Sequence, residues 1–147
     1  MRWTKLSAAE KEAVAGFFRE RFGIILEGLE LFSDKSGRVF ANSKQSASAV
    51  KELDPILAGM KIATLEAAIR PSTAALQLFG RQATKNVVEA NQEQAKSFAA
   101  GGEFSASASE GYVIVSYNGN PLGSGFARNG VVKSLVPKDM RMELQSL

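Results

Sequence analysis

Basic side chains gather near the end of the sequence with little acid to balance them. The stretch 111–141 holds Arg128, Lys133, Lys138 and Arg141 against the single acid Asp139. A Lys or Arg that neutralises a nucleic-acid phosphate releases counterions and so adds affinity without base-specific geometry. Any one of these cations could be an ordinary solvated charge. As a group, they indicate a surface that contacts phosphates. Lys138 and Arg141 follow the last strand expected here, so we expect both side chains to be exposed.

Other side chains could extend this surface. Lys85 and Lys96 precede it in the chain and are candidates for further phosphate contacts. Tyr112 and Tyr117 could stack on an unpaired base. Successive side chains of a strand alternate between its two faces, so these tyrosines point to opposite faces of the strand that we expect here. At most one of them is available for stacking, and the other is expected in the core.

The sequence contains neither cysteine nor histidine. It therefore offers no disulfide, no thiolate nucleophile, no imidazole base and no Cys- or His-ligated metal. We expect no catalytic residue, no metal and no cofactor. An enzyme that uses a carboxylate such as Glu66 or Glu89 is the remaining catalytic hypothesis, and nothing in the spacing of these residues supports it.

The composition is typical of a folded globular protein. Of the 147 residues, 45% are hydrophobic and 22% are charged, and the net charge is +3. The longest apolar runs have four or five residues, which is too short to cross a bilayer. The first residues lack the basic-then-apolar pattern of a signal peptide. We therefore expect a cytoplasmic protein without membrane contact.

The first half of the chain alternates helical and strand patterns. A capping box at Ser7 and Glu10, followed by apolar residues at helical spacing, predicts a helix over 8–22 that ends at a glycine. Apolar runs on either side of a polar 33–37 segment predict a β-hairpin. Further along, the patterns predict in order a short helix over 43–53, a strand over 61–66 and a helix or helical turn over 72–79. In the last two segments the pattern does not separate helix from strand.

A small polar cluster follows the strand predicted over 61–66. Arg70, Ser72, Thr73 and Arg81 lie near the expected junction of the two halves of the chain. Ser72 stands at the start of the predicted helix, just after Pro71, so a role as helix cap explains it best.

The second half predicts a strand over 86–89, a helix over 91–100, a loop over 105–110 and then a three-stranded meander. Asn118-Gly119 and Asn129-Gly130 can both enter the positive-φ region that two-residue hairpin turns require. Within the meander, Gly123 and Gly125 leave one face of their strand bare, which suits close packing in a small barrel.

The meander is also the part of the sequence that resembles a known family. An aromatic-rich strand, a turn, Pro121-Leu122-Gly123-Ser124-Gly125 and a strand ending in Leu135-Val136-Pro137-Lys138 resemble the PUA-type RNA-binding domain. The likeness is to the PUA-like tail of the Nol/Nop/Sun (Fmu) RNA cytosine-5 methyltransferases, and to the C-terminal PUA domain of the Nip-type ribosome-biogenesis factors. The order of elements before it resembles the pre-PUA domain of the Nip-type factors.

This resemblance implies an α+β protein of two domains. Residues 1–81 would form an N-terminal α/β pre-PUA domain, and residues 82–147 a PUA-like mixed β-barrel. In PUA domains, RNA approaches the loop after the first helix. The resemblance therefore adds Gly101 and Gly102 to the candidate RNA-binding residues, although a glycine pair there also ends a helix in left-handed geometry.

The resemblance implies a non-catalytic protein that binds structured rRNA or tRNA, in ribosome biogenesis or RNA modification. The methyltransferases of the family use a catalytic cysteine and an S-adenosylmethionine domain. This sequence has no cysteine and no glycine-rich G-x-G turn after a strand. The alternative is a protein-interaction adaptor in a ribosome-assembly or RNA-modification complex, for which the basic surface would be incidental.

Overall fold

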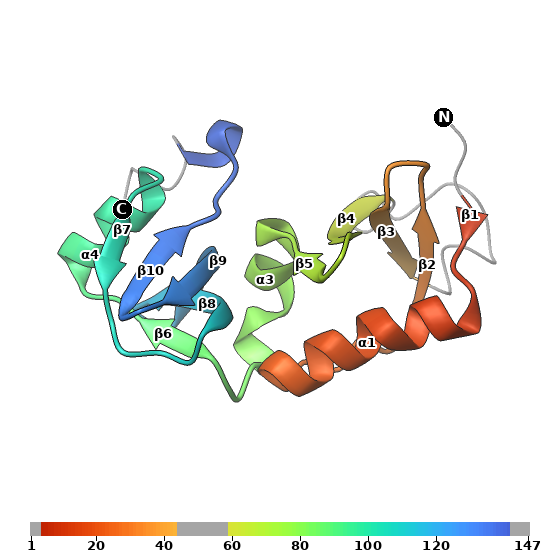
Figure 1. Cartoon of the computed structure of the whole chain (residues 1–147), viewed down its shortest axis with the longest axis horizontal. Coiled ribbons are helices and arrows are strands. Elements are labelled where there is room, and N and C mark those ends of the chain that lie inside the picture. Colours follow the sequence, from red (N-terminus) through yellow and green to blue (C-terminus); the bar gives the residue numbers. More distant parts are fainter. Residues whose placement is uncertain (1–3, 44–58, 142–147) are drawn as a thin grey trace.

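The computed structural model describes residues 4–43 and 59–141. Two antiparallel-rich sheets of five strands each form the two halves of the molecule, and helix α3 (Thr73–Phe79) lies between them (Figure 1). The α+β fold class expected from the sequence is confirmed. Within the described residues, no helix is both long enough and apolar enough to cross a membrane.

The first half is an antiparallel sheet with one long helix. Its strands run in the order β1-β2-β3-β4-β5, with bounds Thr4–Lys5, Leu29–Ser33, Arg38–Ser43, Met60–Leu65 and Ile69–Pro71. The hairpin and the strand over 61–66 that the sequence predicts are confirmed as β2–β3 and β4. Ser43 ends β3, and the rest of the helix predicted over 43–53 lies outside the described residues.

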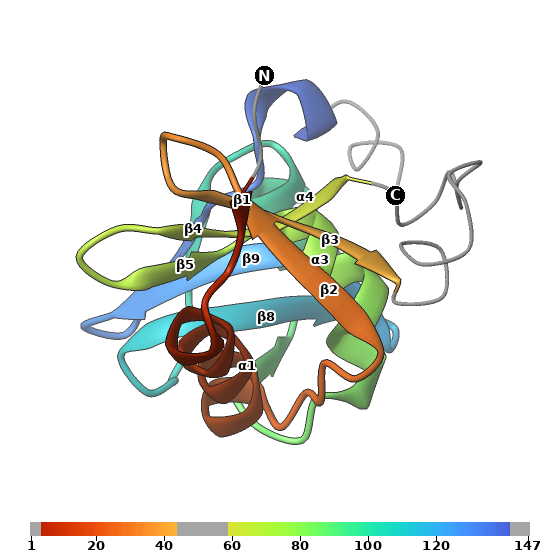
Figure 2. The ribbon, with the colours of Figure 1, turned by 90° about the vertical axis from the view of Figure 1, so that its right-hand side faces the viewer.

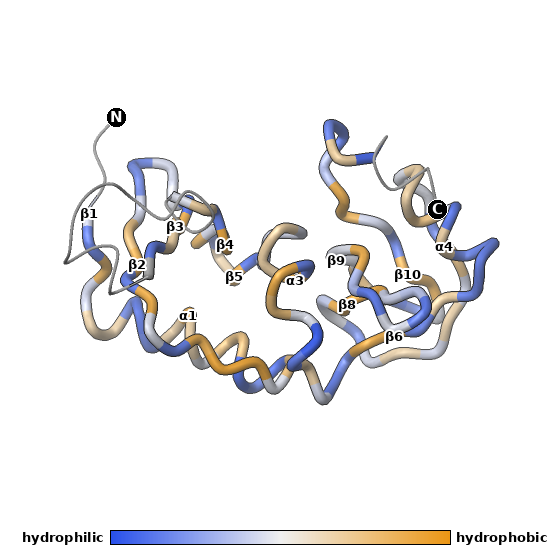
Figure 3. The backbone as a smooth tube through the Cα atoms, turned by 180° about the vertical axis from the view of Figure 1, so that it is seen from behind, coloured by the Kyte–Doolittle hydropathy of each residue, from blue (hydrophilic) through white to orange (hydrophobic). Residues whose placement is uncertain are grey.

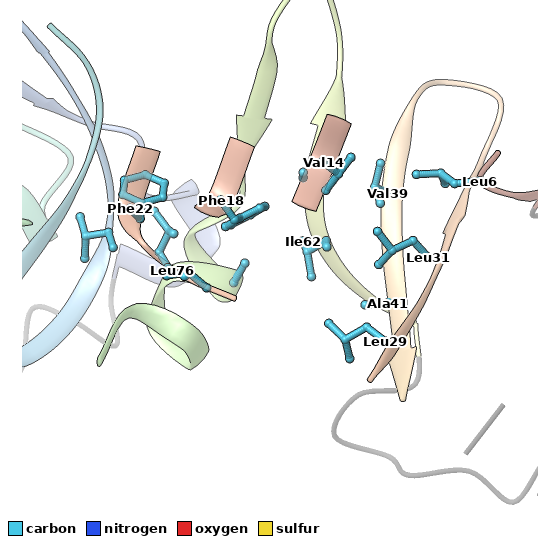
Figure 4. Close-up of a cluster of buried hydrophobic side chains, with 14 residues drawn as sticks. Leu6, Val14, Phe18, Phe22, Leu29, Leu31, Val39, Ala41, Ile62 and Leu76 are labelled. Carbon is cyan, nitrogen blue, oxygen red and sulfur yellow. The ribbon is translucent and has the colours of Figure 1, made fainter. Parts of the chain in front are cut away.

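Helix α1 (Ala8–Phe22) confirms the first predicted helix. The Ser7 hydroxyl accepts from the Glu10 backbone N–H, and the Glu10 carboxylate accepts from the Ser7 N–H in return. The helix ends at Gly23, whose φ of 76° is the left-handed geometry of a helix C-cap. Val14, Phe18 and Phe22 are fully buried along α1; Val14 lies beside Val39 of the sheet, and Phe22 lies beside Leu76 of α3 (Figure 4).

The second half contains a parallel edge strand and the predicted meander. Its elements are β6 (Val87–Glu89), α4 (Gln92–Ala99), β7 (Glu103–Ser105), β8 (Gly111–Tyr117), β9 (Asn120–Arg128), β10 (Val131–Ser134) and the 3-10 turn η2 (Lys138–Met140). The strand order is β6-β8-β9-β10-β7, with β6 parallel to β8. Asn118 and Asn129 have φ of 52° and 53°, which confirms both hairpin turns.

Other predicted elements of this half are confirmed with small differences. The strand over 86–89 and the helix over 91–100 appear as β6 and α4. The segment predicted as a loop over 105–110 begins with Ser105, the last residue of the short strand β7 that the sequence did not indicate. Beyond Ser105 the chain is irregular until β8, as expected.

Two clusters of buried side chains form the core, and α3 contributes to the first of them. The first gathers around α1 and the first sheet, and it includes Ile114 of β8; the second lies between α4 and the second sheet. Figure 3 shows hydrophobic segments of α1 and α3 towards the middle of the molecule. Because Ile114 belongs to the first cluster, the cores do not separate at one position of the chain, and the domain division at residue 81 stays a prediction.

Helix α3 lies against β9 at short range. The Thr73 hydroxyl accepts from the Ser124 N–H at 3.1 Å, and the Gln77 amide donates to the Leu122 carbonyl at 2.9 Å. A Cβ atom placed on Gly123 would lie 2.9 Å from Thr73 Cγ2, and one on Gly125 would lie 3.0 Å from Val132 Cγ1. The close packing that the sequence suggested for these glycines is confirmed.

A second connection joins α1 to the strand β8. Arg21 Nε donates to the Tyr112 carbonyl at 2.6 Å, and its Nη2 donates to the Ser109 carbonyl at 3.2 Å. Partial burial lowers the pKa of the Arg21 guanidinium, which still carries its charge at neutral pH. Viewed along the long axis, β1–β3 cross in front of β8 and β9 (Figure 2). The two halves are thus held by hydrogen bonds as well as by apolar packing.

Candidate nucleic-acid interface

Two of the predicted cations share one face of the second sheet. Lys133 of β10 is paired with Phe126 of β9, and Arg128 lies two residues further along β9, so all three side chains point to the same side. Ala127 and Val132 alternate with them and are buried in the second core cluster. The Arg128 and Lys133 side chains are exposed. We call this surface, with Tyr112 opposite Phe126, the β10 face.

Tyr112 and Phe126 give the β10 face an aromatic floor. Their rings meet edge to face with centroids 5.2 Å apart, and Tyr112 also meets Phe17 of α1 at 6.1 Å. Both side chains are half-buried. Tyr112 packs against the first core cluster, and Tyr117 packs against the second. The predicted separation of the two tyrosines is confirmed, and Tyr112 is the one beside the cations.

An acid lies next to one of these cations. Glu103 of β7 is the cross-strand partner of Lys133 on the side away from Phe126, and its side chain is exposed. Facing side chains of opposite charge on neighbouring strands attract one another. Lys133 is therefore partly balanced, whereas Arg128 has no acid at its paired position, which is Val131.

The other predicted residues of the second half meet at one corner of the sheet. Gly101 follows α4 with φ of 91°, and the Gly102 carbonyl accepts from the Ser134 N–H at the end of β10. Arg141 follows η2 and reaches the same place. We call the set Lys96, Gly101, Gly102, Lys138 and Arg141 the glycine-loop corner.

Arg141 is less exposed than its position beyond the last strand suggested. Its Nε donates to the Val136 carbonyl at 3.1 Å, and its guanidinium lies over Gly101, where an added Cβ atom would be 2.6 Å from Cζ. Gly101 thus makes room for a cation as well as for a turn. The expectation that Arg141 is exposed is wrong, because the side chain helps to hold η2 against the α4–β7 loop. Lys138 is exposed, as expected.

Lys96 lies near the glycine-loop corner, whereas Lys85 lies at the other edge of the second sheet. Lys96 is exposed on the last turn of α4, next to the glycine-loop corner. Lys85 precedes β6, at the opposite edge of the sheet from β7, and its Nζ donates to the Glu20 carbonyl at 2.9 Å. Lys85 therefore neutralises the carbonyl end of α1. The structure brings seven of the predicted residues to two adjoining surfaces and leaves Lys85 apart from them.

A pocket of about 730 Å³ lies between the two halves. Its walls come from β3, β4, β5, the start of α3 and the segment 135–140, and its basic lining residues are Arg38, Lys61 and Arg70. We call it the inter-sheet cleft. The sequence had indicated Arg70 as part of a polar cluster at this junction. Lys61 was missed, because it reads only as an exposed position of a strand.

Ser72 at the edge of the cleft has the capping role that the sequence predicted. Its hydroxyl accepts from the Ala75 N–H at 3.0 Å and donates to the Lys61 carbonyl at 2.8 Å. It thus ends β5, begins α3 and ties both to β4. Arg81 lies elsewhere and donates to the Asn120 side chain at 2.6 Å.

Arg38 is held by an acid outside the cleft. Its Nε lies 2.7 Å from Asp34 Oδ2, and the other carboxylate oxygen accepts from the Arg38 and Ser36 backbones. Desolvation would raise the pKa of Asp34, but hydrogen bonds from Arg38 and Ser36 outweigh it and lower the pKa to about 2. Across the described part of the chain, no cluster of three His, Cys, Asp or Glu residues could hold a metal ion.

The comparisons with known proteins are of two kinds: a family model that matches part of the second half, and solved structures that match nearly the whole chain. Residues 85–142 match the family model described as the methyltransferase RsmF PUA domain. A conserved PUA domain protein from Thermoplasma acidophilum has a similar structure, with a TM-score of 0.65 and 12% sequence identity over 96% of this chain and 99% of that one. A PUA domain from Aeropyrum pernix K1, crystallised with tartrate, gives a TM-score of 0.52 and 17% identity over 97% of this chain and 79% of that one. No curated protein matches the sequence.

Proposed function

We propose that this protein, whose second half is a PUA-type domain, is a non-catalytic RNA-binding protein. The family match over residues 85–142 and the similar PUA structures confirm the domain that the sequence resembled. A PUA domain is an RNA-binding module. The proposal adds that this one uses the β10 face and the glycine-loop corner to contact RNA.

The observation that carries the proposal is that three of the candidate cations are available to bind phosphate. Arg128, Lys133 and Lys138 are exposed, and none of them forms an ion pair with any residue in 4–43 or 59–141. A cation without a protein partner can exchange small counterions for phosphates at little cost. Phe126 and Tyr112 add an aromatic surface beside Lys133, which suits an unpaired base better than a duplex.

The finer part of the proposal concerns the RNA and its process. We propose structured rRNA or tRNA as the ligand, in ribosome biogenesis or RNA modification, and the cytoplasm as the compartment. The resemblance to the Nol/Nop/Sun tail and to the Nip-type factors supports this choice. A ribosome-assembly or RNA-modification protein is the partner that the same resemblance suggests.

A second candidate is an adaptor that binds protein. Ile25, Leu78 and Val87 are large apolar side chains that are 48%, 45% and 40% exposed. Single exposed apolar residues are common on protein surfaces, so this observation is weaker than the group of unpaired cations. The adaptor hypothesis gains support only if RNA binding fails.

The test is a binding titration with an RNA hairpin that carries an unpaired loop, repeated at several salt concentrations. With about four to six phosphate contacts, log affinity should fall with log salt with a slope of about −3 to −5. A DNA duplex of equal length should compete poorly, because the aromatic floor favours unpaired bases. Absent binding, or a flat salt response, would overturn the proposal. Equal competition by DNA would reduce it to nonspecific electrostatics.

A further inference from the structure

The inter-sheet cleft has a basic row that the strand register builds. Arg38 of β3, Thr64 of β4 and Arg70 of β5 are successive cross-strand partners, so their side chains point to the same side of the first sheet. The neighbouring row of Val39, Ala63 and Pro71 is buried. A shift in register between Val39 and Phe40 brings Lys61 opposite Phe40, and Lys61 also lines the cleft.

The cations that line the cleft differ in whether an acid already forms an ion pair with them. Arg38 is paired with Asp34 at 2.7 Å. Lys61 and Arg70 are exposed, and neither forms an ion pair within the described ranges 4–43 and 59–141. Glu66, also exposed, is the acid in the lining. Two cations of the cleft, Lys61 and Arg70, are thus available to bind an anion, and the Glu66 carboxylate would repel it.

The far wall of the cleft leads to the proposed RNA surface. Leu135, Pro137 and Met140 line the cleft from the second half, and Lys138 of the glycine-loop corner stands between Pro137 and Met140 in the chain. η2 thus shares the lining of the cleft with residues of β4 and β5. An RNA backbone that contacts Lys138 and continues along the surface therefore reaches the cleft next.

We infer that the inter-sheet cleft is a second contact site for the phosphate backbone of the same RNA, with Lys61 and Arg70 as its cations. This inference rests on the proposed function. A small anion would be expected to need buried donors, whereas both cations here are exposed at the rim of an open, partly polar space. Exposed cations suit a flexible, single-stranded segment that continues from the glycine-loop corner.

The experiment compares two RNAs and three double variants. One RNA is a hairpin with an unpaired loop, and the other adds a single-stranded extension of about ten nucleotides, within the range that one such groove accommodates. The cleft variant is Lys61→Glu with Arg70→Glu. The surface variant is Arg128→Glu with Lys138→Glu. The control is Lys5→Glu with Lys11→Glu, where Lys5 lies on β1, at the other edge of the first sheet from β5.

The cleft variant should bind the extended RNA about three- to tenfold more weakly than the wild type, and its salt slope should fall by about two, one for each lost phosphate contact. It should bind the short hairpin as the wild type does. Glu66→Gln, which removes the opposing carboxylate, should tighten binding of the extended RNA by about twofold. Thermal unfolding of each variant, measured without RNA, separates an effect on binding from a loss of fold.

The outcomes distinguish the inference from the proposed function. If the surface variant loses affinity while the cleft and control variants bind the extended RNA equally well, the cleft inference is wrong and the proposed function stands. If the wild type binds neither RNA, both fail. Protection of Lys61 from acetylation by the extended RNA, and not by the hairpin, supports the cleft directly, and equal acetylation with and without RNA would count against it.

Discussion

The two halves of the molecule use their charges differently. In the first half, Lys5 is paired with Glu30, Arg19 with Glu12 and Glu20, and Arg38 with Asp34; these are the ion pairs found within the described residues. In the second half, Arg128, Lys133 and Lys138 are exposed without such partners in the described ranges, as are Lys61 and Arg70 where the first half lines the inter-sheet cleft. Net charge does not reveal this contrast, because it counts paired and unpaired cations alike. Exposed cations without an ion-pair partner, rather than the net charge, mark the surface that can bind phosphate.

Arg21 is the sharpest test of this contrast, because it is a first-half cation whose partners are in the second half. Arg21→Gln should reduce the free energy of unfolding by about 1.5–3 kcal/mol, since it removes charged hydrogen bonds to the Tyr112 and Ser109 carbonyls. RNA affinity well below the melting temperature should not change. Urea unfolding and an RNA titration measure the two effects. An intact stability with weakened RNA binding would reverse the assignment.

The unpaired cations should show the opposite behaviour. Arg128→Glu with Lys138→Glu should weaken RNA binding by about tenfold or more, because two phosphate attractions become repulsions. Both side chains are exposed, so the stability should change by about 0.5 kcal/mol or less for each. Arg141 is left unchanged here because its hydrogen bond to Val136 makes its reversal a test of folding.

The matched control for that variant is Lys5→Glu with Lys11→Glu, which changes the formal charge by the same amount in the first half. Its RNA affinity should stay within about twofold of the wild type at a salt concentration where the Debye length is about 8 Å. Equal weakening by both double variants would mean that net charge, and not the β10 face, governs binding.

A smaller effect should come from the acid beside Lys133. Glu103→Gln frees Lys133 from its cross-strand partner, and it should tighten RNA binding by about two- to threefold. The change leaves the backbone pairing of β7 and β10 in place. Fluorescence anisotropy at low salt is sensitive enough to resolve it. A weaker complex would indicate that Glu103 itself accepts a hydrogen bond from the RNA.

The smallest effect on RNA binding is expected from Asp34→Asn, a substitution that breaks the ion pair between Asp34 and Arg38. The pKa of Asp34 is lowered from 3.8 to about 2, so the ionised form is favoured by folding. Its contribution to stability is complete above pH 4 and is lost as the pH falls towards 2. Asp34→Asn should flatten the stability profile in that range and leave the affinity for the short RNA hairpin, which does not reach the cleft, near the wild-type value. An unchanged acid limb would show that Asp34 does not stabilise the β2–β3 turn.

The local signals of the sequence predicted most of the elements. The capping box at Ser7 and the two Asn-Gly turns are determined by residues within a few positions of each other, and helix α1 and the meander followed from them. The strand β7 was missed because its three residues lead into a low-complexity segment, and its pairing with β10 depends on residues far along the chain.

The candidate site was harder to predict, because it depends on contacts between distant residues. The sequence indicated the cations of the β10 face, but not that Glu103 faces Lys133. It did not show that Arg141 folds over Gly101, which requires the α4–β7 loop and η2 to meet. Lys61 gave no signal of its own, since only the folded first sheet brings it into the lining of the same cleft as Arg70.

Ile114 has a consequence for how the molecule responds to its ligand. This residue belongs to β8, yet its fully buried side chain completes the core formed by α1 and the first sheet. Cutting the chain between the halves would therefore leave an uncovered apolar surface on both pieces, and the protein should melt in a single cooperative transition. RNA held at the β10 face would then protect the amide protons of α1 from exchange with solvent, although it touches none of them.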